Sequence, residues 1–411
     1  MESQPYLLRI WIYIINEMEV KNLKWPLMHQ AIEKSDLSAI SKYLKKGSSI
    51  KLTHGPYVKK FEKEWSKWLG VKYSVMVNSG ASANDISMKI VKEKYGNGEV
   101  IVPPLTWVSD ISSVINSGLI PVFVDIDSKT LGISTDAILD AITPRTRAVF
   151  ITHVLGLNAL TTKLLTELKK KKIALIEDVC ESHGAKFKNK KVGTFGLLSN
   201  FSFYYAHHMT TIEGGMISTN SKEVYNMARS MRSHGLLREI DDLKFRKQTT
   251  KKYPDLNSEF IFLYPAYNMR PTEIGGILGL SQLKRLNKNI QRRNKNFEYF
   301  LSLLDSNKYQ TDLVLQGQSN YALIVILKKS NMNQRNKVER TLFKNGIEFR
   351  RGLSGGGNQL RQPYLKKIAE IYNLSEFPNI EHIHNYSWYI GNYPKLKKNN
   401  IKNLANLLNN I

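Results

Sequence analysis

The chain has 411 residues, 42% hydrophobic and 23% charged, a composition typical of a soluble enzyme with enough core for two domains. Its single cysteine, Cys180, excludes an internal disulfide framework and a cysteine-ligated iron–sulfur cluster within one chain, and it fits the reducing cytoplasm. The formal net charge of +25 comes from lysines in short scattered runs without a nucleic-acid reader motif, so we interpret it as a solvated surface that also suits anionic substrates.

The first apolar stretch is too short to span a membrane. Tyr6–Ile15 has about ten residues and contains Arg9, whereas a spanning helix needs about 20. The stretch also lacks the basic region and the small-residue cleavage site of a signal peptide. We expect either an N-terminal helix that packs on the body or an extension outside the core fold. A helix should follow over Pro26–Lys46, where apolar residues recur at helical spacing.

A turn of small residues between a strand and a helix predicts an anion site. Val71–Asn78 has the apolar content of a strand, and Asn84–Lys94 has the pattern of a helix. The turn between them, Ser79-Gly80-Ala81-Ser82, places free backbone amides at a helix N-terminus, where a phosphate can bind. Because such turns are common, this pattern alone is a weak signal.

Strands and helices then alternate, which predicts a mainly parallel sheet in an α/β protein. The predicted elements are strand Glu99–Pro103, strand Ile120–Asp125, helix Asp136–Ile142, strand Ala148–Thr152, helix Thr161–Lys172 and strand Ile173–Asp178. Two carboxylates, Glu177 and Asp178, end the last strand, and Glu181 follows closely. Ligands of open α/β sheets bind at this carboxyl edge, although an Asp–Glu pair at a strand end is more often a surface pair.

The segment Ser199–Thr219, SNFSFYYAHHMTTIEGGMIST, organises the predicted site. A buried strand leads into the pair His207-His208, a hydroxyl-rich turn, the pair Gly214-Gly215 and a second short strand. This layout resembles the cofactor-anchoring segment of the DegT-type family of fold-type I pyridoxal phosphate (PLP) enzymes. The family pattern is S-F-x-x-x-K followed by threonines and E-G-G, and its lysine binds PLP covalently. Ser202 matches the serine, and His207 stands in place of the lysine.

The resemblance covers Leu27 to Leu408 and implies a role for each motif. Asp178 would pair with the pyridine nitrogen of PLP, with Glu181 near the phenolic oxygen. Trp107 would stack on the ring, although a lone tryptophan after a strand is more often a core residue. The turn containing Gly80 and Ala81, together with Ser202, would hold the phosphate. Without a lysine, PLP and its pyridoxamine form (PMP) would be held non-covalently.

The resemblance also implies a homodimer with shared active sites. Tyr267-Asn268-Met269-Arg270 matches a family segment that reaches into the neighbouring subunit's site, where the asparagine meets the cofactor phosphate. Arg270 is therefore expected to bind substrate in the partner, and so is His234, at the end of a predicted helix over Lys222–Ser233. A small C-terminal α/β domain should follow. The expected division is an extension and first helix over 1–50, a large PLP-binding domain over 51–290 and the small domain over 291–411.

Family members with histidine in place of the lysine are sugar dehydrases rather than aminotransferases. The resemblance therefore implies a 3-dehydratase that removes the C3 hydroxyl of a nucleotide-linked 4-keto-6-deoxy sugar, with GDP-4-keto-6-deoxy-mannose as the expected substrate. L-Glutamate would supply the amino group, ammonia would be released, and no metal would be needed. His207 would be the base, with an imidazole pKa near neutrality. His208 is an alternative base, and a PLP-dependent sugar aminotransferase or a cofactor-binding regulator are alternative functions.

Overall fold

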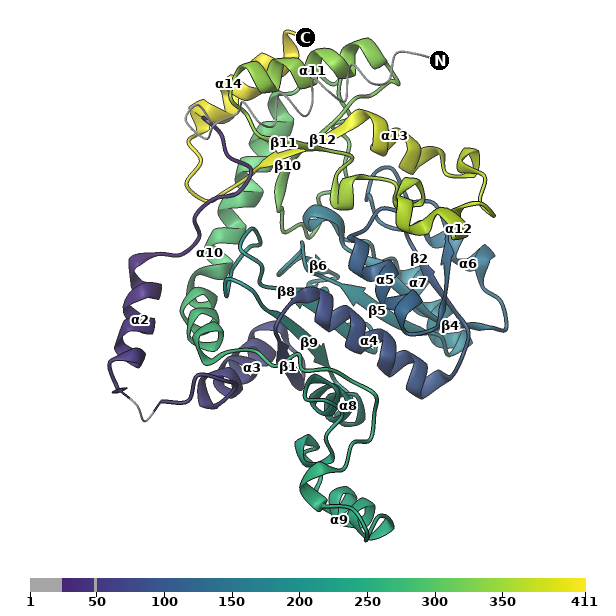
Figure 1. Ribbon diagram of the computed structural model, residues 1–411. Helices are drawn as coiled ribbons and strands as arrows, with labels where there is room; N and C mark the ends of the chain where they lie inside the picture. Colours follow the sequence, from purple (N-terminus) through teal and green to yellow (C-terminus); the bar gives the residue numbers. More distant parts are fainter. Residues whose placement is uncertain (1–23, 48–49) are drawn as a thin grey trace.

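The computed structural model describes residues 24–47 and 50–411, so the predicted apolar stretch Tyr6–Ile15 lies outside the described residues. A mixed sheet forms the centre of the larger, lower part of the molecule in Figure 1. The strands identified in this sheet are, in spatial order, β1 (Tyr73–Val77), β9 (Gly215–Thr219), β8 (Leu198–Ser202), β5 (Ala174–Asp178), β4 (Thr146–Thr152), β2 (Glu99–Val102) and β3 (Ile120–Phe123). The neighbours from β8 to β3 pair in parallel, and β9 runs antiparallel to β1 and β8, as expected for a mainly parallel sheet.

Hydrophobic cores cover both faces of the sheet, and successive side chains of each strand point into one core and then the other. On β1, Val75 and Val77 join one hydrophobic core, and Met76 joins the other. The first core is packed by α4 (Gly80–Tyr95), α5 (Val108–Asn116) and α8 (Lys222–Arg232). The second core is packed by α3 (Pro56–Leu69), α6 (Thr135–Ala141), α7 (Thr162–Lys171) and the first half of α10 (Glu273–Leu303).

The smaller part of the molecule, at the top of Figure 1, contains an antiparallel sheet in the order β10-β12-β11. Its strands are β10 (Ala322–Ile326), β11 (Phe349–Arg351) and β12 (Ser387–Gly391), and its helices include α11 (Met332–Lys344), α12 (Lys366–Ala369), α13 (Pro378–Tyr386) and α14 (Lys398–Asn409). Helix α10 runs from the large part into the small part and passes through the predicted boundary at residue 290. The domain division itself stays a prediction.

The N-terminal segment differs from the prediction in its first residues. The helix α2 extends over Lys34–Leu44 only, whereas the sequence pattern suggested a helix from Pro26. The residues before α2 pack on the small part instead: Trp25 forms a parallel bridge with Ile347, and its indole Nε1 donates to the carbonyl oxygen of Gly391 at 2.9 Å.

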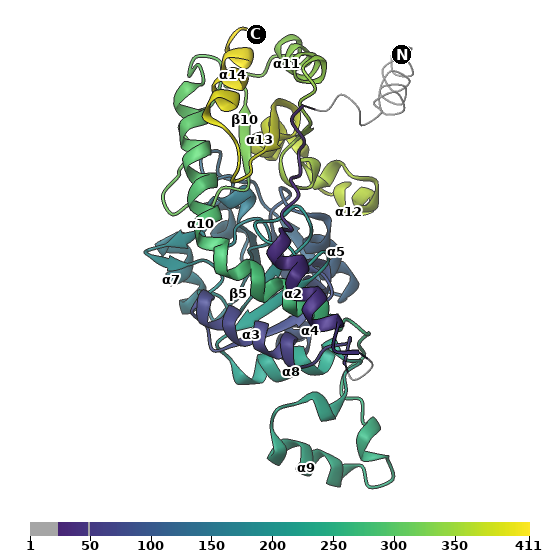
Figure 2. The ribbon, with the colours of Figure 1, turned by 90° about the vertical axis from the view of Figure 1, so that its left-hand side faces the viewer.

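One helix projects away from the body. Figures 1 and 2 both show α9 (Leu243–Lys252) at the tip of an arm below the large part. Within residues 24–47 and 50–411, no helix combines the length and apolar content needed to cross a bilayer.

Candidate functional site

The carboxyl ends of β5 and β8 meet the N-terminus of α4 at one edge of the large sheet. Asp178 is the last residue of β5 and lies opposite Asn200 of the parallel strand β8. Ser202 ends β8 and directly contacts the first residue of α4. The topology therefore brings together residues that the sequence separates widely, because parallel strands place their carboxyl ends on the same edge.

The N-terminus of α4 is built as an anion-binding turn. Ser79 caps the helix, and its hydroxyl oxygen accepts a hydrogen bond from the amide of Ser82 at 3.0 Å. The amides of Gly80 and Ala81, the first two of the helix, have no acceptor within it. A Cβ on Gly80 would lie 2.7 Å from the Cβ of Ser202, so this backbone approaches β8 more closely than any side chain would permit.

The glycines of the pair Gly214-Gly215 serve two different close approaches. A Cβ on Gly215 would lie 2.2 Å from the carbonyl oxygen of Ser79, so this glycine lets β9 pass close to the α4 N-terminus. A Cβ on Gly214 would lie 2.2 Å from Oγ1 of Thr211, so this glycine is needed for the turn that leads into β9.

Asp178 is a buried acceptor at this edge. Its side chain is 3% exposed, and Oδ1 accepts a hydrogen bond from the amide of Cys180 at 2.7 Å. Glu181 lies in the turn after β5, where Oε2 accepts from the amide of Leu155 and Oε1 from the hydroxyl of Ser354, each at 3.1 Å. Burial raises the pKa of Glu181 to about 7, so this carboxyl can hold or release a proton near neutral pH.

His207 lies in the turn between β8 and β9. Its backbone amide donates to the carbonyl oxygen of Tyr204 at 3.1 Å, and its ring centroid lies 5.6 Å from that of Tyr321 and 6.1 Å from that of His183. Nδ1 of His207 has no hydrogen-bond partner among the described residues. Burial, with a smaller contribution from Arg293, lowers the pKa of this imidazole to about 3, which corrects the expectation of a near-neutral pKa.

His208 has a different environment. Its side chain is 3% exposed, and Nε2 lies 2.9 Å from the carbonyl oxygen of Ser319, which fixes the ring against the segment before β10. Burial lowers its pKa well below the ordinary value. This imidazole is therefore held by a structural hydrogen bond, whereas the neighbouring His207 ring is not.

The sequence reading missed the surroundings of the histidine pair. The sequence analysis assigned no role to His183, Tyr321 or Arg293. Arg293 is 6% exposed, its Nη1 donates to the carbonyl oxygen of Tyr321 at 2.8 Å, and its charge lowers the pKa of His183, His207 and His208 after burial itself. Only spacing along α10 could have indicated that Arg293 points inward.

Trp107 follows β2 and caps α5, and its side chain is 56% exposed. The preceding residues contact the glycine-rich loop of the small part: Leu105 bridges Asn358, and a Cβ on Gly355 would meet the carbonyl oxygen of Thr106 at 2.0 Å. Trp107 therefore lies at the carboxyl edge of the sheet with its ring available, as a stacking residue requires. Among residues 24–47 and 50–411, no aromatic ring contacts the ring of Trp107.

His234, Asn268 and Arg270 form a separate group. The amide of His234 donates to the carbonyl oxygen of Tyr267, and the carbonyl oxygen of Met269 accepts from Asn78 at the end of β1, both at 3.0 Å. His234 and Asn268 are exposed and Arg270 is half-buried. In the described part of the chain, no hydrogen bond or ion pair joins these three side chains to His207, Asp178 or Ser202.

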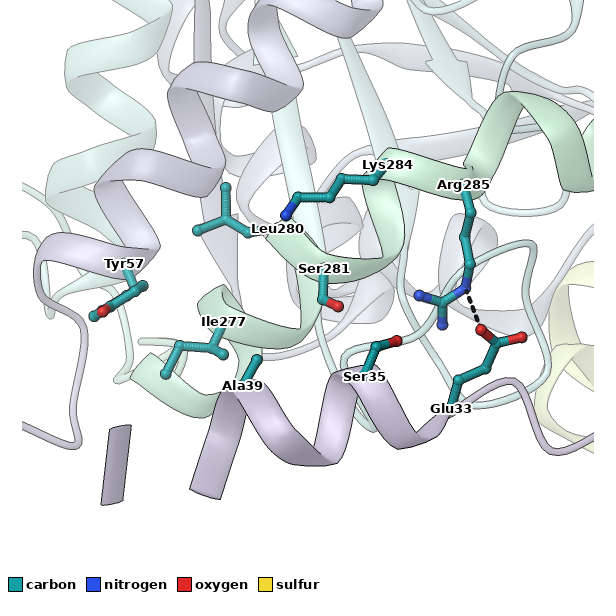
Figure 3. A pocket seen from close by; sticks show the side chains of 9 residues that line it. All are labelled: Glu33, Ser35, Ala39, Tyr57, Ile277, Leu280, Ser281, Lys284 and Arg285. Atoms are coloured by element: carbon teal, nitrogen blue, oxygen red, sulfur yellow. Dashed lines mark ion pairs between the residues drawn. The ribbon is translucent and has the colours of Figure 1, made fainter. Parts of the chain in front are cut away.

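A groove between α2 and α10 is distinct from this site. It encloses about 430 Å³, and Arg285 lies 3.8 Å from Glu33 at one end of it (Figure 3). The residues lining it are Glu33, Ser35, Ala39, Tyr57, Ile277, Leu280, Ser281, Lys284 and Arg285. None of them is a predicted site residue, and Arg285 already pairs with Asp36.

The chain is similar to known nucleotide-sugar enzymes over most of its length. The profile of the DegT/DnrJ/EryC1/StrS aminotransferase family matches residues 30–409. GDP-4-keto-6-deoxy-D-mannose 3-dehydratase of Yersinia pseudotuberculosis is 34% identical over 394 residues, covering 94% of this chain and 98% of the relative. A crystal structure of GDP-4-keto-6-deoxymannose-3-dehydratase with a trapped PLP–glutamate geminal diamine has a TM-score of 0.82 at 30% identity and covers 94% of this chain and 100% of that chain.

A second solved structure is informative about ligands of that enzyme. A mutant of GDP-4-keto-6-deoxymannose-3-dehydratase with bound GDP-perosamine has a TM-score of 0.80 at 31% identity, covering 94% of this chain and 100% of that chain. These matches confirm the predicted α/β architecture of the fold-type I PLP enzymes.

Proposed function

Because the chain belongs to the DegT/DnrJ/EryC1/StrS aminotransferase family, we propose that it is a PLP-dependent 3-dehydratase of a nucleotide-linked 4-keto-6-deoxy sugar. GDP-4-keto-6-deoxy-mannose is the proposed substrate and L-glutamate the proposed amino donor, as a step toward 3,6-dideoxy sugars of surface polysaccharides. The observation that carries the proposal is His207, an imidazole with an unpartnered Nδ1 at the position where aminotransferases of the family have a lysine. The proposed location is the cytoplasm, which suits a chain with one cysteine and a nucleotide-sugar substrate.

The residues at the sheet edge fit PLP. The free amides of Gly80 and Ala81, with the hydroxyl of Ser202 against them, suit a phosphate, because a helix N-terminus favours negative charge. Asp178 is a buried carboxylate that suits a protonated pyridine nitrogen. Gly80 gives the clearest evidence that the turn fits a phosphate. Because this residue has no side chain, its backbone amide can lie close to Ser202.

Trp107 and Glu181 complete the proposed cofactor site. The exposed ring of Trp107 lies after β2 and would cover one face of the pyridine ring. Glu181, with a pKa of about 7, would share or hold a proton near the phenolic oxygen. When bound, PLP supplies an electron sink for the carbon attached to its ring.

The proposed role of His207 is to move protons. Burial lowers its pKa to about 3 in the ligand-free chain, so the imidazole is neutral at pH 7 and has a nitrogen lone pair that can accept a proton, but this burial also makes it a weaker base than an ordinary histidine. It would take the proton from the C4′ carbon of the cofactor and deliver it to the departing C3 oxygen of the sugar. An imidazole cannot form the covalent link that a lysine amine forms, so the chain would have no means to complete transamination through this position. Unsaturated product would leave and release ammonia on hydrolysis.

We further propose that the active unit is a homodimer with shared sites. Among the described residues, no hydrogen bond or ion pair joins the side chains of His234, Asn268 and Arg270 to His207, Asp178 or Ser202, and Tyr267 beside them is exposed. Asn268 would reach the cofactor phosphate of the partner subunit, and His234 and Arg270 would meet the substrate there. The surplus of positive charge would favour encounter with the diphosphate of a nucleotide sugar.

The experiment is a product analysis with purified protein, PLP, L-glutamate and GDP-4-keto-6-deoxy-mannose. We expect ammonia release and loss of the C3 hydroxyl of the sugar, followed by mass spectrometry and NMR. An amino group retained on the sugar would instead support a PLP-dependent aminotransferase. Cofactor binding without either product would support a regulator. The CDP-linked sugar, tested in parallel, decides the nucleotide.

A further inference from the structure

A second buried carboxyl lies beside Asp178. Asp110, in the first turn of α5, is 1% exposed, and its carboxyl lies within hydrogen-bonding range of the Asp178 carboxyl. The backbone places it there: Thr152 is paired with Asp178 across β4 and β5, and the Thr152 hydroxyl donates to Oδ2 of Asp110 at 2.9 Å. No sequence pattern singled out Asp110.

Every donor to this pair is neutral. Oδ1 of Asp110 accepts from the side-chain amide of Asn84 at 2.7 Å, and Oδ2 accepts from the hydroxyl of Thr106 at 2.5 Å. Asp178 accepts from the amide of Cys180. No cationic side chain among these donors therefore offsets the charge of the pair, and both residues are at most 3% exposed. Ionised carboxylates can only accept hydrogen bonds, so a hydrogen bond between the two requires that one of them carries a proton.

The neighbouring titratable groups do not supply a compensating charge. Burial raises the pKa of the Cys180 thiol and of the Tyr364 hydroxyl, so both are neutral at pH 7. Burial and the adjacent Asp178 raise the pKa of Asp110 well above its ordinary value, which favours a proton on Asp110. A pair with one proton has one negative charge, which matches one protonated pyridine nitrogen.

We propose that Asp110 is a positioning residue that carries this shared proton and holds Asp178 as a single anion directed at the pyridine nitrogen of the cofactor. The proposal rests on the proposed function, because it requires PLP at this site. Two ionised carboxylates would repel each other and turn Asp178 away, and two protonated ones would leave the nitrogen without a counter-charge. Asp110 would thus determine the orientation and charge of Asp178, which in turn keeps the pyridine nitrogen of PLP protonated so that the ring can accept electrons.

The test compares Asp110→Asn with Asp110→Leu. Asparagine has almost the shape of a protonated aspartic acid and can donate to Asp178 at any pH, whereas leucine fills the space with a somewhat larger apolar side chain and loses every hydrogen bond. We expect Asp110→Asn to bind PLP within about threefold of the wild type, and Asp110→Leu to bind about 10- to 100-fold more weakly, measured by absorbance titration. Ser113→Ala is the matched control, since Ser113 is equally buried on α5 and donates only to the backbone oxygen of Asp110.

Two spectroscopic measurements separate positioning from packing. Infrared difference spectra at a pH of about 9, where Glu181 is ionised, should show a neutral carboxyl in the wild type that Asp110→Asn lacks. The pyridine ¹⁵N shift of labelled PLP should report a protonated nitrogen in the wild type and Asp110→Asn, and loss of that protonation in Asp110→Leu. Absence of the neutral carboxyl, or wild-type PLP binding by Asp110→Leu, overturns the proposal. If Asp110→Leu does not fold, the infrared comparison decides alone. Failure of the wild type to bind PLP would overturn the proposed function and, with it, this role.

Discussion

His207 and His208 are consecutive in the chain, but the structure uses their imidazoles differently. Nε2 of His208 lies 2.9 Å from the carbonyl oxygen of Ser319, whereas Nδ1 of His207 has no partner among the described residues. Both pKa values are lowered by burial, so both rings are neutral at pH 7. Nδ1 of His208 also has no partner among the described residues, but the hydrogen bond to Ser319 holds that ring in place, whereas no hydrogen bond is found for the His207 ring in the described part of the chain. We therefore expect His207 to be the ring that exchanges a proton with a ligand.

His207→Asn should abolish proton transfer while cofactor binding is retained. Loss of a general base typically lowers the rate about 100- to 10,000-fold. Single-turnover measurements of the glutamate half-reaction and of sugar dehydration should both show this loss, because the same imidazole serves both steps. The absorbance of bound PLP checks that the site remains loaded.

His208→Asn is the matched control for that variant. It should lower the free energy of unfolding by about 1–3 kcal/mol, because the carbonyl oxygen of Ser319 loses a buried partner, and leave the rate of dehydration within about tenfold. An inactive His208→Asn together with an active His207→Asn would show that His208 is the base.

The cofactor should not be covalently attached to the wild-type chain. Dialysis should remove PLP, and borohydride reduction followed by mass spectrometry should find no pyridoxyl group on any lysine. His207→Lys restores an amine at this position, so its reduced form should carry the pyridoxyl mass on Lys at position 207. A reduced pyridoxyl-lysine in the wild type would contradict the assignment of His207.

A mixed-subunit experiment tests the shared site. If Asn268 serves the partner's site, mixing inactive His207→Asn and Asn268→Ala subunits creates dimers in which one site has both wild-type residues. Activity should then recover to about a quarter of the wild-type value after subunit exchange, because mixed dimers form by chance. Sedimentation checks the dimer. If each site used only its own chain, no mixture of the two variants would regain activity.

Glu181 should make the stability of the cofactor-free protein fall as pH rises toward neutrality. Its folded-state pKa of about 7 lies above the ordinary value of 4.5, so between these two pH values the folded state keeps a proton that the unfolded state releases. The free energy of unfolding should fall by at most about 1.4 kcal/mol per pH unit in this window and level off above it.

Glu181→Gln removes this contribution. The free energy of unfolding of the variant minus that of the wild type should therefore be larger at pH 8 than at pH 5. Urea unfolding at both pH values measures the difference, and the comparison cancels the contributions of the histidines. An equal difference between variant and wild type at the two pH values would show that Glu181 titrates normally.

Gly80→Ala should damage both stability and cofactor binding. The new Cβ would lie 2.7 Å from the Cβ of Ser202, which is attached to the backbone and cannot swing away. We expect the free energy of unfolding to fall by about 1–3 kcal/mol and PLP affinity to decrease, since the free amides of α4 must move. Ala81→Ser, exposed on the same turn, should leave both unchanged.

The sequence alone determined the alternation of strands and helices and the central motif. Apolar runs bounded by turns predicted most strands of the large sheet within a few residues, because a strand buried on both faces is apolar throughout. The motif around Ser202 identified His207 in place of lysine. This replacement predicted dehydration of the sugar rather than aminotransfer. Local patterns failed at Pro26, where helical spacing was present but the chain pairs with the small part instead.

Only the tertiary structure separated His207 from His208 and brought Asp110 to Asp178. The partner that fixes His208 is Ser319, 111 residues away, and the hydroxyl that joins Asp110 to the β5 edge comes from Thr152, 42 residues away. Periodicity reports which side of an element is apolar, but it carries no information about which polar groups meet inside the fold. Contacts between buried polar groups depend on how the sheet and helices pack. The same packing buries His207 and Glu181, which lowers the pKa of the first and raises that of the second. Hydrogen bonds and desolvation act between groups that are near in space rather than in sequence.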